Sequence, residues 1–83
     1  MRVLKFVHNI NGVTRLFIDE IELKTTIDPI PIREYRYQRH AYNIGFAEHL
    51  IQTTLKQLES ENVPLTTEEI AAVINYMRKQ LGI

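Results

Sequence analysis

One short segment of the sequence combines basic and aromatic side chains in a way that suits it to binding. Residues 33–42 read REYRYQRHAY and carry three arginines against the single acid Glu34, so the local charge is +2 before histidine is counted. Arginine pairs with phosphates and tyrosine stacks on bases, but the same two residue types are also enriched where proteins bind proteins. The predicted binding residues are Arg33, Tyr35, Arg36, Tyr37, Arg39, His40 and Tyr42.

Three interpretations of segment 33–42 stay open. On a helix the arginines and His40 would share one face, which can contact a protein partner or hold the phosphates of a nucleic acid or nucleotide. Alternatively the tyrosines pack in the core, and the arginines are solvated or paired with Asp19, Glu20 or Glu22. Because the chain has no other basic cluster, a long duplex is a poor candidate. We expect a protein partner, with nucleic acid as the alternative.

The other chemistry-bearing residues form no catalytic or metal-binding pattern. His40 and His49 are nine positions apart, about 180° around a helix, so they would point in opposite directions. His8 lies far from both in the sequence, and Ser60 is the single serine with no base placed near it. The three glycines stand apart, which excludes a phosphate-cradling loop. We therefore predict a protein that is not an enzyme and has no metal and no cofactor.

The chain contains no cysteine, which excludes disulfides, thiolate zinc sites and iron–sulfur clusters. Residues 65–82, LTTEEIAAVINYMRKQLG, resemble the C-terminal helix of class I c-type cytochromes over 18 of the 83 residues. That family attaches haem through a C-x-x-C-H motif, which a cysteine-free chain lacks. No haem is therefore predicted.

Length and composition indicate one small globular domain, residues 1–83. The chain is 45% hydrophobic and 24% charged, and its ten basic and ten acidic residues give a formal net charge of zero. Arg2 and Lys5 interrupt the first apolar run, so no signal peptide is expected. No stretch approaches the ~20 apolar residues that span a bilayer. We expect a cytoplasmic protein that does not enter the membrane.

The N-terminal residues predict a β-hairpin with strands at about 2–9 and 13–24. Asn11-Gly12 is the preferred pair for a two-residue turn, and runs of Val, Ile, Phe and Leu flank it. That turn sets Phe6 opposite Phe17 and leaves apolar side chains on both faces of the hairpin. Since helices from the same chain cover one face, we expect the protein to form a homodimer through the edges or faces of the hairpin.

The rest of the chain predicts an extended crossing and two helices. Residues 25–32, TTIDPIPI, are expected to be extended, because proline fixes its own φ and biases the preceding residue away from the helix. Apolar residues recur at helical spacing over about 34–61, where a short third strand at 32–37 is the alternative, and over 67–81. Thr66 and Glu69 form a capping box for the last helix. The predicted fold class is α+β.

No motif identifies the function directly. We predict a small non-enzymatic binding protein that acts through protein–protein contacts, as regulators and inhibitors encoded by phages and mobile elements do. The alternatives are a protein that binds nucleic acid or nucleotide phosphates through segment 33–42, and a small subunit of a structural assembly.

Overall fold

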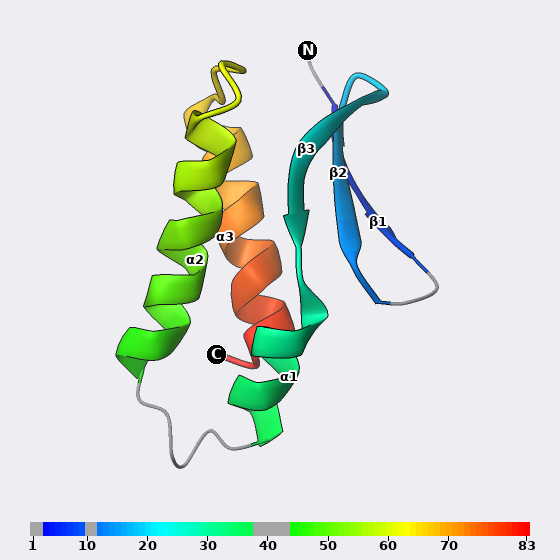
Figure 1. The fold of residues 1–83 in the computed structure, drawn as a ribbon. Helices are drawn as coiled ribbons and strands as arrows, with labels where there is room; N and C mark the ends of the chain where they lie inside the picture. The colour runs from blue at the N-terminus through cyan, green and yellow to red at the C-terminus, as the bar shows by residue number, and fades with distance from the viewer. Residues whose placement is uncertain (1–2, 10–11, 38–43) are drawn as a thin grey trace.

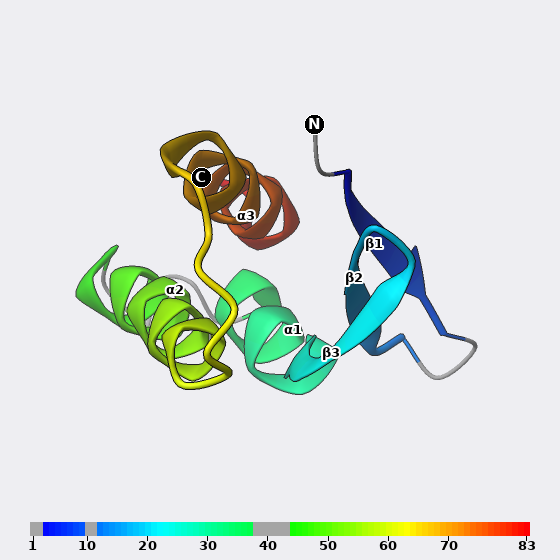
Figure 2. The same ribbon diagram turned by 90° about the horizontal axis from the view of Figure 1, so that it is seen from above.

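The computed structural model describes residues 3–9, 12–37 and 44–83, with only the backbone at positions 36, 37 and 44. The fold is α+β, as predicted. An antiparallel sheet in the order β1-β2-β3 comes first and three helices follow. All three helices lie on one side of the sheet, and α2 and α3 run antiparallel beside each other (Figures 1 and 2). The bounds are β1 Leu4–His8, β2 Thr14–Ile18, β3 Ile21–Ile27, α1 Pro29–Tyr37, α2 Ile44–Glu59 and α3 Thr67–Leu81.

The predicted register of the first hairpin is wrong by one residue. Phe6 pairs with Leu16 rather than with Phe17. Asn9 N donates to Val13 O at 2.8 Å and Gly12 N donates to Asn9 O at 2.9 Å, so three residues, not two, connect the strands. Gly12 has φ +89°, the left-handed conformation that closes a three-residue hairpin loop.

The observed register gives the sheet one apolar face. Leu16 and Ile18 are buried beside half-buried Leu4 and Phe6, whereas Lys5 lies on the other face. A slip by one residue exchanges the faces of a whole strand, so the gain from a single buried face outweighs the turn preference of Asn-Gly. The apolar side chains of the first hairpin therefore gather mainly on one face, whereas the sequence predicts them on both.

The second predicted strand, 13–24, is in fact two strands. Asp19 and Glu20 both have positive φ, 50° and 69°, and form the tight turn between β2 and β3. A two-residue turn of type I′ needs positive φ at both central positions, and aspartate tolerates that conformation better than most residues. The third strand therefore comes from the end of the predicted second strand and not from residues 32–37.

The proline segment is not an extended crossing beyond Ile27. Helix α1 begins at Pro29, and the Asp28 carboxylate accepts from the backbone N–H of Ile30 at 2.9 Å. Aspartate is a favoured N-cap, and proline is favoured at the first helical position because that N–H has no helical acceptor. The sequence Asp28-Pro29 thus starts a helix. The helix predicted over 34–61 is consequently observed as α1 and α2, with residues 38–43 outside the described residues.

Helix α3 is confirmed over the predicted residues 67–81. The Thr66 hydroxyl accepts from Glu69 N at 3.2 Å, and a Glu69 carboxylate oxygen accepts from Thr66 N at 2.8 Å. Gly82, at φ +80°, ends the helix in the left-handed conformation. Capping residues and apolar spacing agree here, which explains why the sequence predicts α3 correctly.

The core lies between the sheet and the helices. The side chains of Leu16, Val73 and Leu81 are essentially inaccessible to solvent. From the sheet, buried side chains alternate along two strands, which is the pattern of a sheet covered on one face. These residues are Thr14, Leu16, Ile18, Leu23, Thr25 and Ile27.

Candidate functional site

Of the predicted Arg/Tyr site, the structure describes the side chains of two residues, Arg33 and Tyr35, and they differ in exposure. Arg33 is exposed on α1, whereas Tyr35 is only 5% exposed and stacks on Phe46 with ring centroids 6.3 Å apart. Tyr35 is therefore a core residue, which agrees at this position with the alternative in which the tyrosines of segment 33–42 pack in the core. Arg36 and Tyr37 belong to α1 by their backbone, and their side chains lie outside the described residues. The remaining predicted site residues, also outside the described residues, are Arg39, His40 and Tyr42.

Arg33 extends toward the loop of the first hairpin. An added Cβ on Gly12 would lie 3.0 Å from Arg33 Nη2, so the guanidinium lies against the loop where glycine leaves room. The small pocket beside it, about 180 Å³, is also lined by His8, Thr14 and Gln80. Among the described residues that line it there is no carboxylate. The structure thus brings Arg33 to the end of β1, which sequence spacing did not indicate.

Close polar contacts among three side chains join the end of β1 to α3. His8 Nε2 lies 2.7 Å from the Tyr76 hydroxyl, Tyr76 lies 2.8 Å from Thr14 Oγ1, and Thr14 Oγ1 lies 3.3 Å from His8 Nδ1. The Phe6 ring stacks on Tyr76 at 4.2 Å between centroids. These contacts hold β1 in place without using its outer edge.

Two hydrogen bonds fix the direction of the backbone groups of β1. At one end, Val3 O accepts from Asp19 N at 3.0 Å, and at the other, Asn9 N donates to Val13 O at 2.8 Å. In an antiparallel pair, alternate residues direct both N–H and C=O toward the neighbouring strand. The odd-numbered positions of β1 therefore face β2.

The even-numbered positions of β1 consequently face away from β2. No described segment pairs with this side of the strand, because β1 is the first strand of the order β1-β2-β3. An edge of this kind presents a row of donors and acceptors that another strand can use. The outward backbone groups belong to Leu4, Phe6 and His8.

The opposite edge of the sheet, β3, carries a bulge at its centre. The pairs Arg15–Thr26 and Phe17–Glu22 leave one residue of β2 opposite three residues of β3. A bulge leaves residues out of the ladder, so neighbouring N–H groups need another acceptor.

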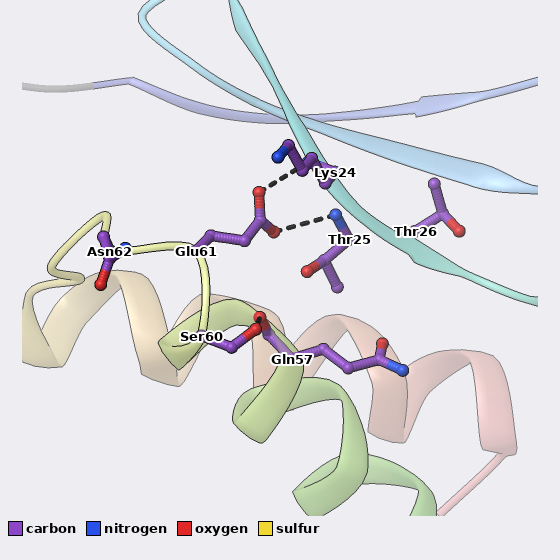
Figure 3. A pocket seen from close by; sticks show the side chains of 7 residues that line it. All are labelled: Lys24, Thr25, Thr26, Gln57, Ser60, Glu61 and Asn62. Carbon is purple, nitrogen blue, oxygen red and sulfur yellow. Dashed lines mark hydrogen bonds between the residues drawn. The ribbon is translucent and has the colours of Figure 1, made fainter.

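The Glu61 carboxylate supplies that acceptor from the turn after α2. One oxygen accepts from Lys24 N at 2.6 Å and the other from Thr25 N at 2.9 Å (Figure 3). Gln57, Ser60 and Asn62 line the same groove, which is about 580 Å³ in volume. Glu61 thus covers the edge of β3 at the point where the ladder is broken.

Hydrogen bonding decides the charge state of Glu61. Partial burial alone would raise the pKa of this carboxyl, but the hydrogen bonds from the Thr25 side chain and from the N–H groups of Lys24 and Thr25, with the Lys24 charge, lower it below its ordinary value of 4.5. A carboxylate that accepts several hydrogen bonds stays ionised at neutral pH. The Glu61 carboxylate that binds β3 therefore carries a full negative charge at neutral pH.

The sheet face away from the helices is mixed in character. Arg15 forms a two-point ion pair with Glu22, at 2.5 and 2.8 Å, and its guanidinium lies 5.1 Å from the Phe17 ring centre. Lys5 is exposed and Val7 half-buried on the same face of β1. The strip of this face next to the open edge thus combines one cation with apolar surface.

Comparison of the chain with protein-family models, with curated proteins and with solved structures finds no match. Residues 3–9, 12–37 and 44–83 include no helix long and apolar enough to cross a membrane. The same part of the chain holds no group of three histidine or acidic side chains placed to bind a metal.

Sequence reasoning missed the feature that distinguishes the two edges. Glu61 is one of two acids near the end of α2, and nothing in its sequence surroundings links it to residues 24 and 25, which lie far away in the chain. The open edge follows from strand order, which depends on the unrecognised turn at Asp19 and Glu20.

Proposed function

We propose that this is a small non-enzymatic binding protein that acts through protein–protein contacts, with the outer edge of β1 as its binding surface. The observation that carries the proposal is the difference between the two edges of the sheet. Glu61 occupies the N–H groups of Lys24 and Thr25 at the centre of β3, while the outward groups of Leu4, Phe6 and His8 face no described segment. Strand addition to an open edge is a common mode of peptide recognition, in which backbone hydrogen bonds supply affinity.

The surroundings of β1 support this function. Phe6 stacks on Tyr76, and His8 bonds the Tyr76 hydroxyl, so the strand is held in place before a partner arrives. A preorganised surface loses less entropy on binding. Val7 and Lys5 beside the edge give a partner strand apolar contact and one charge to recognise.

The wider proposal keeps the biological setting expected from the sequence. We propose a regulator or inhibitor in the cytoplasm, of the kind encoded by phages and mobile elements. Self-association as a homodimer belongs to the same proposal, because a second copy can occupy an open edge as readily as another protein can.

The experiment removes one donor and leaves every side chain in place. A chain of 83 residues can be assembled by peptide ligation with the Phe6 nitrogen methylated, so that its outward N–H is lost. The matched control carries the same methyl at Thr67, the first residue of α3, whose N–H has no acceptor within the helix. Both chains and the unmodified one are immobilised and exposed to a native extract.

Loss of a retained protein with methylated Phe6, but not with methylated Thr67, supports the proposal. Equal retention by all three chains contradicts β1 as the binding edge. Thermal melts of the three chains show whether the methyl groups leave the fold intact, since a global loss of structure would lower the melting temperature of the Phe6 chain alone.

Phosphate or nucleic-acid binding is the alternative function, favoured by one observation. Arg33 is exposed beside a pocket whose described lining holds no carboxylate, so its guanidinium can pair with a phosphate. Against it, Tyr35 is buried and cannot stack on a base. Titration with short single-stranded DNA and RNA at low salt tests whether the chain binds nucleic acid. Binding that weakens with salt on a shallow slope, set by about three phosphates, and is lost in Arg33→Glu would support it.

The third candidate, a small subunit of a structural assembly, also uses an open edge. It differs in having many copies joined in a fixed order, so it predicts species much larger than a dimer in the same solutions.

A further inference from the structure

We infer that the occupant of the β1 edge is a second copy of this chain, joined antiparallel about a two-fold axis that passes beside Phe6. The inference rests on the proposed function of this edge. The resulting dimer has one continuous six-stranded sheet, with the two β1 strands at its centre. Both of its outer edges are β3 strands, in each of which Glu61 binds the N–H groups of Lys24 and Thr25.

The register with its axis at Phe6 uses every outward group of the strand. Leu4 then faces the partner's His8, and Phe6 faces the partner's Phe6. Antiparallel residues that point toward each other exchange both of their backbone hydrogen bonds. The three outward positions 4, 6 and 8 therefore give three such pairs within β1 itself.

Neighbouring registers are worse. Moving the axis to Lys5 places Lys5 directly opposite the partner's Lys5, and like charges in that position repel. Moving it to Val7 leaves Leu4 without a partner inside β1, so only Phe6 and His8 form bonded pairs. With the axis at Phe6, Lys5 lies opposite the partner's Val7, and no like charges are directly opposed.

The face toward the helices gains apolar contact in the same register. Leu4 and Phe6 are both half-buried, although they belong to the core face of the sheet. In this register the partner's His8 and Phe6 lie beside them and would cover part of the surface that they still expose. Burial of that surface is favourable, and aromatic pairs across strands add to it.

The choice between the two edges also follows from charge. A strand that approached β3 would have to displace the Glu61 carboxylate from Lys24 N and Thr25 N. An incoming carbonyl is a weaker acceptor than the carboxylate that already occupies this position. The centre of β3 is therefore the less favourable place for an added strand, and we expect the sheet to extend through β1.

Charge exchange at Val7 tests the register, because Val7 lies opposite the partner's Lys5. Val7→Glu creates two opposite-charge pairs across the axis, and Val7→Lys creates two like-charge pairs. From the strength of such cross-strand pairs we expect about fivefold tighter and about fivefold weaker association, respectively. Sedimentation equilibrium of the full chain, from about 10 µM to about 1 mM, measures the dissociation constants of such a small interface.

Thr26→Glu and Thr26→Lys are the matched controls. Thr26 is exposed on the same face, and within the monomer it lies opposite Arg15, as Val7 does. The two control variants have the same net charges as the Val7 variants and change the same neighbour. Because Thr26 lies on β3, we expect their dissociation constants to differ by less than about twofold.

The outcomes separate the dimer from the general function. The inference is supported if the dimer dissociation constant falls in Val7→Glu, rises in Val7→Lys and stays nearly the same in the two Thr26 variants. If Val7→Lys does not fold, comparison of Val7→Glu with the unmodified chain gives the same test. A single 9.8 kDa species at every concentration overturns the inference, as does a dimer that treats the two Val7 variants alike. In either case the proposed function is tested separately by the methylation experiment. It stands if the chain with methylated Phe6 no longer retains a different protein from the extract, and it fails if all three immobilised chains retain the same proteins.

Discussion

Removal of the Glu61 carboxylate should destabilise the protein by an amount that can be derived from two hydrogen bonds. The carboxylate accepts from Lys24 N at 2.6 Å and from Thr25 N at 2.9 Å. Hydrogen bonds to charged groups contribute about 1.5–3 kcal/mol, but water can reach this partly exposed position, so about 1 kcal/mol for each bond is appropriate. Glu61→Ala should therefore cost about 2 kcal/mol, and Glu61→Gln, which keeps one acceptor, about 1 kcal/mol.

The effect should depend on pH in a defined direction. The pKa of Glu61 is below 4.5 in the folded protein because backbone and side-chain hydrogen bonds outweigh the effect of burial. A lowered folded pKa gives stability that is complete above the unfolded value and is lost as the pH falls through the folded value. The difference between the parent chain and Glu61→Gln should stay constant from pH 7 to about 5 and shrink below about 4.5.

Urea unfolding followed by circular dichroism measures these differences. The matched control is Glu59→Gln, which removes the same charge from an exposed position in the last turn of α2. In a domain of this size, 1 kcal/mol corresponds to about 4–8 °C in melting temperature, so thermal melts provide a second measurement. The claim that Glu61 stabilises β3 would be refuted if the Glu61 and Glu59 variants had equal free energies of unfolding at pH 7. It would also be refuted if the loss of stability in Glu61→Gln were unchanged at pH 3.

Two further predictions concern caps and loops. Thr66→Ala should lower the free energy of unfolding by about 1 kcal/mol, because an N–H at the start of α3 loses its acceptor; melting temperatures equal to the parent's would contradict the cap. Gly82→Ala should cost about 1–2 kcal/mol for its positive φ alone, since a Cβ there meets nothing within 4 Å. Gly12→Ala should cost more, because it combines positive φ with the 3.0 Å approach of Arg33. Adding Arg33→Ala should recover part of that excess in urea unfolding, and strict additivity of the two changes would contradict the contact.

The sequence predicted the parts of the fold in which local and tertiary preferences agree. The helix over 67–81 carries a cap, an apolar stripe and a glycine stop, and all three are present. The register of the first hairpin was not predictable from Asn11-Gly12, because turn preference competes with burial of Phe6 beside Leu16. Burial of a whole strand face involves more free energy than one turn type.

Helix α1 shows a different limitation. Its start has a readable signal, because Asp28 caps the helix and Pro29 takes the first helical position. Proline also biases the preceding residue toward an extended backbone, and that preference predicts the extended crossing instead. The candidate site was less predictable still. Residue type pointed to Arg33 and Tyr35, whereas the open edge of β1 and its contrast with the Glu61 clamp depend on strand order, which no local pattern encodes.

Amide hydrogen exchange at Phe6, followed by NMR as a function of protein concentration, tests the central claim most directly. In dilute solution the outward N–H of Phe6 should exchange with solvent rapidly, while the Thr25 N–H, bonded to Glu61 at 2.9 Å, should exchange slowly. As the concentration rises, exchange at Phe6 should slow and exchange at Thr25 should stay the same. Slow exchange at Phe6 in dilute solution would show that the β1 edge is already covered, and fast exchange at every concentration would show that no second copy occupies it.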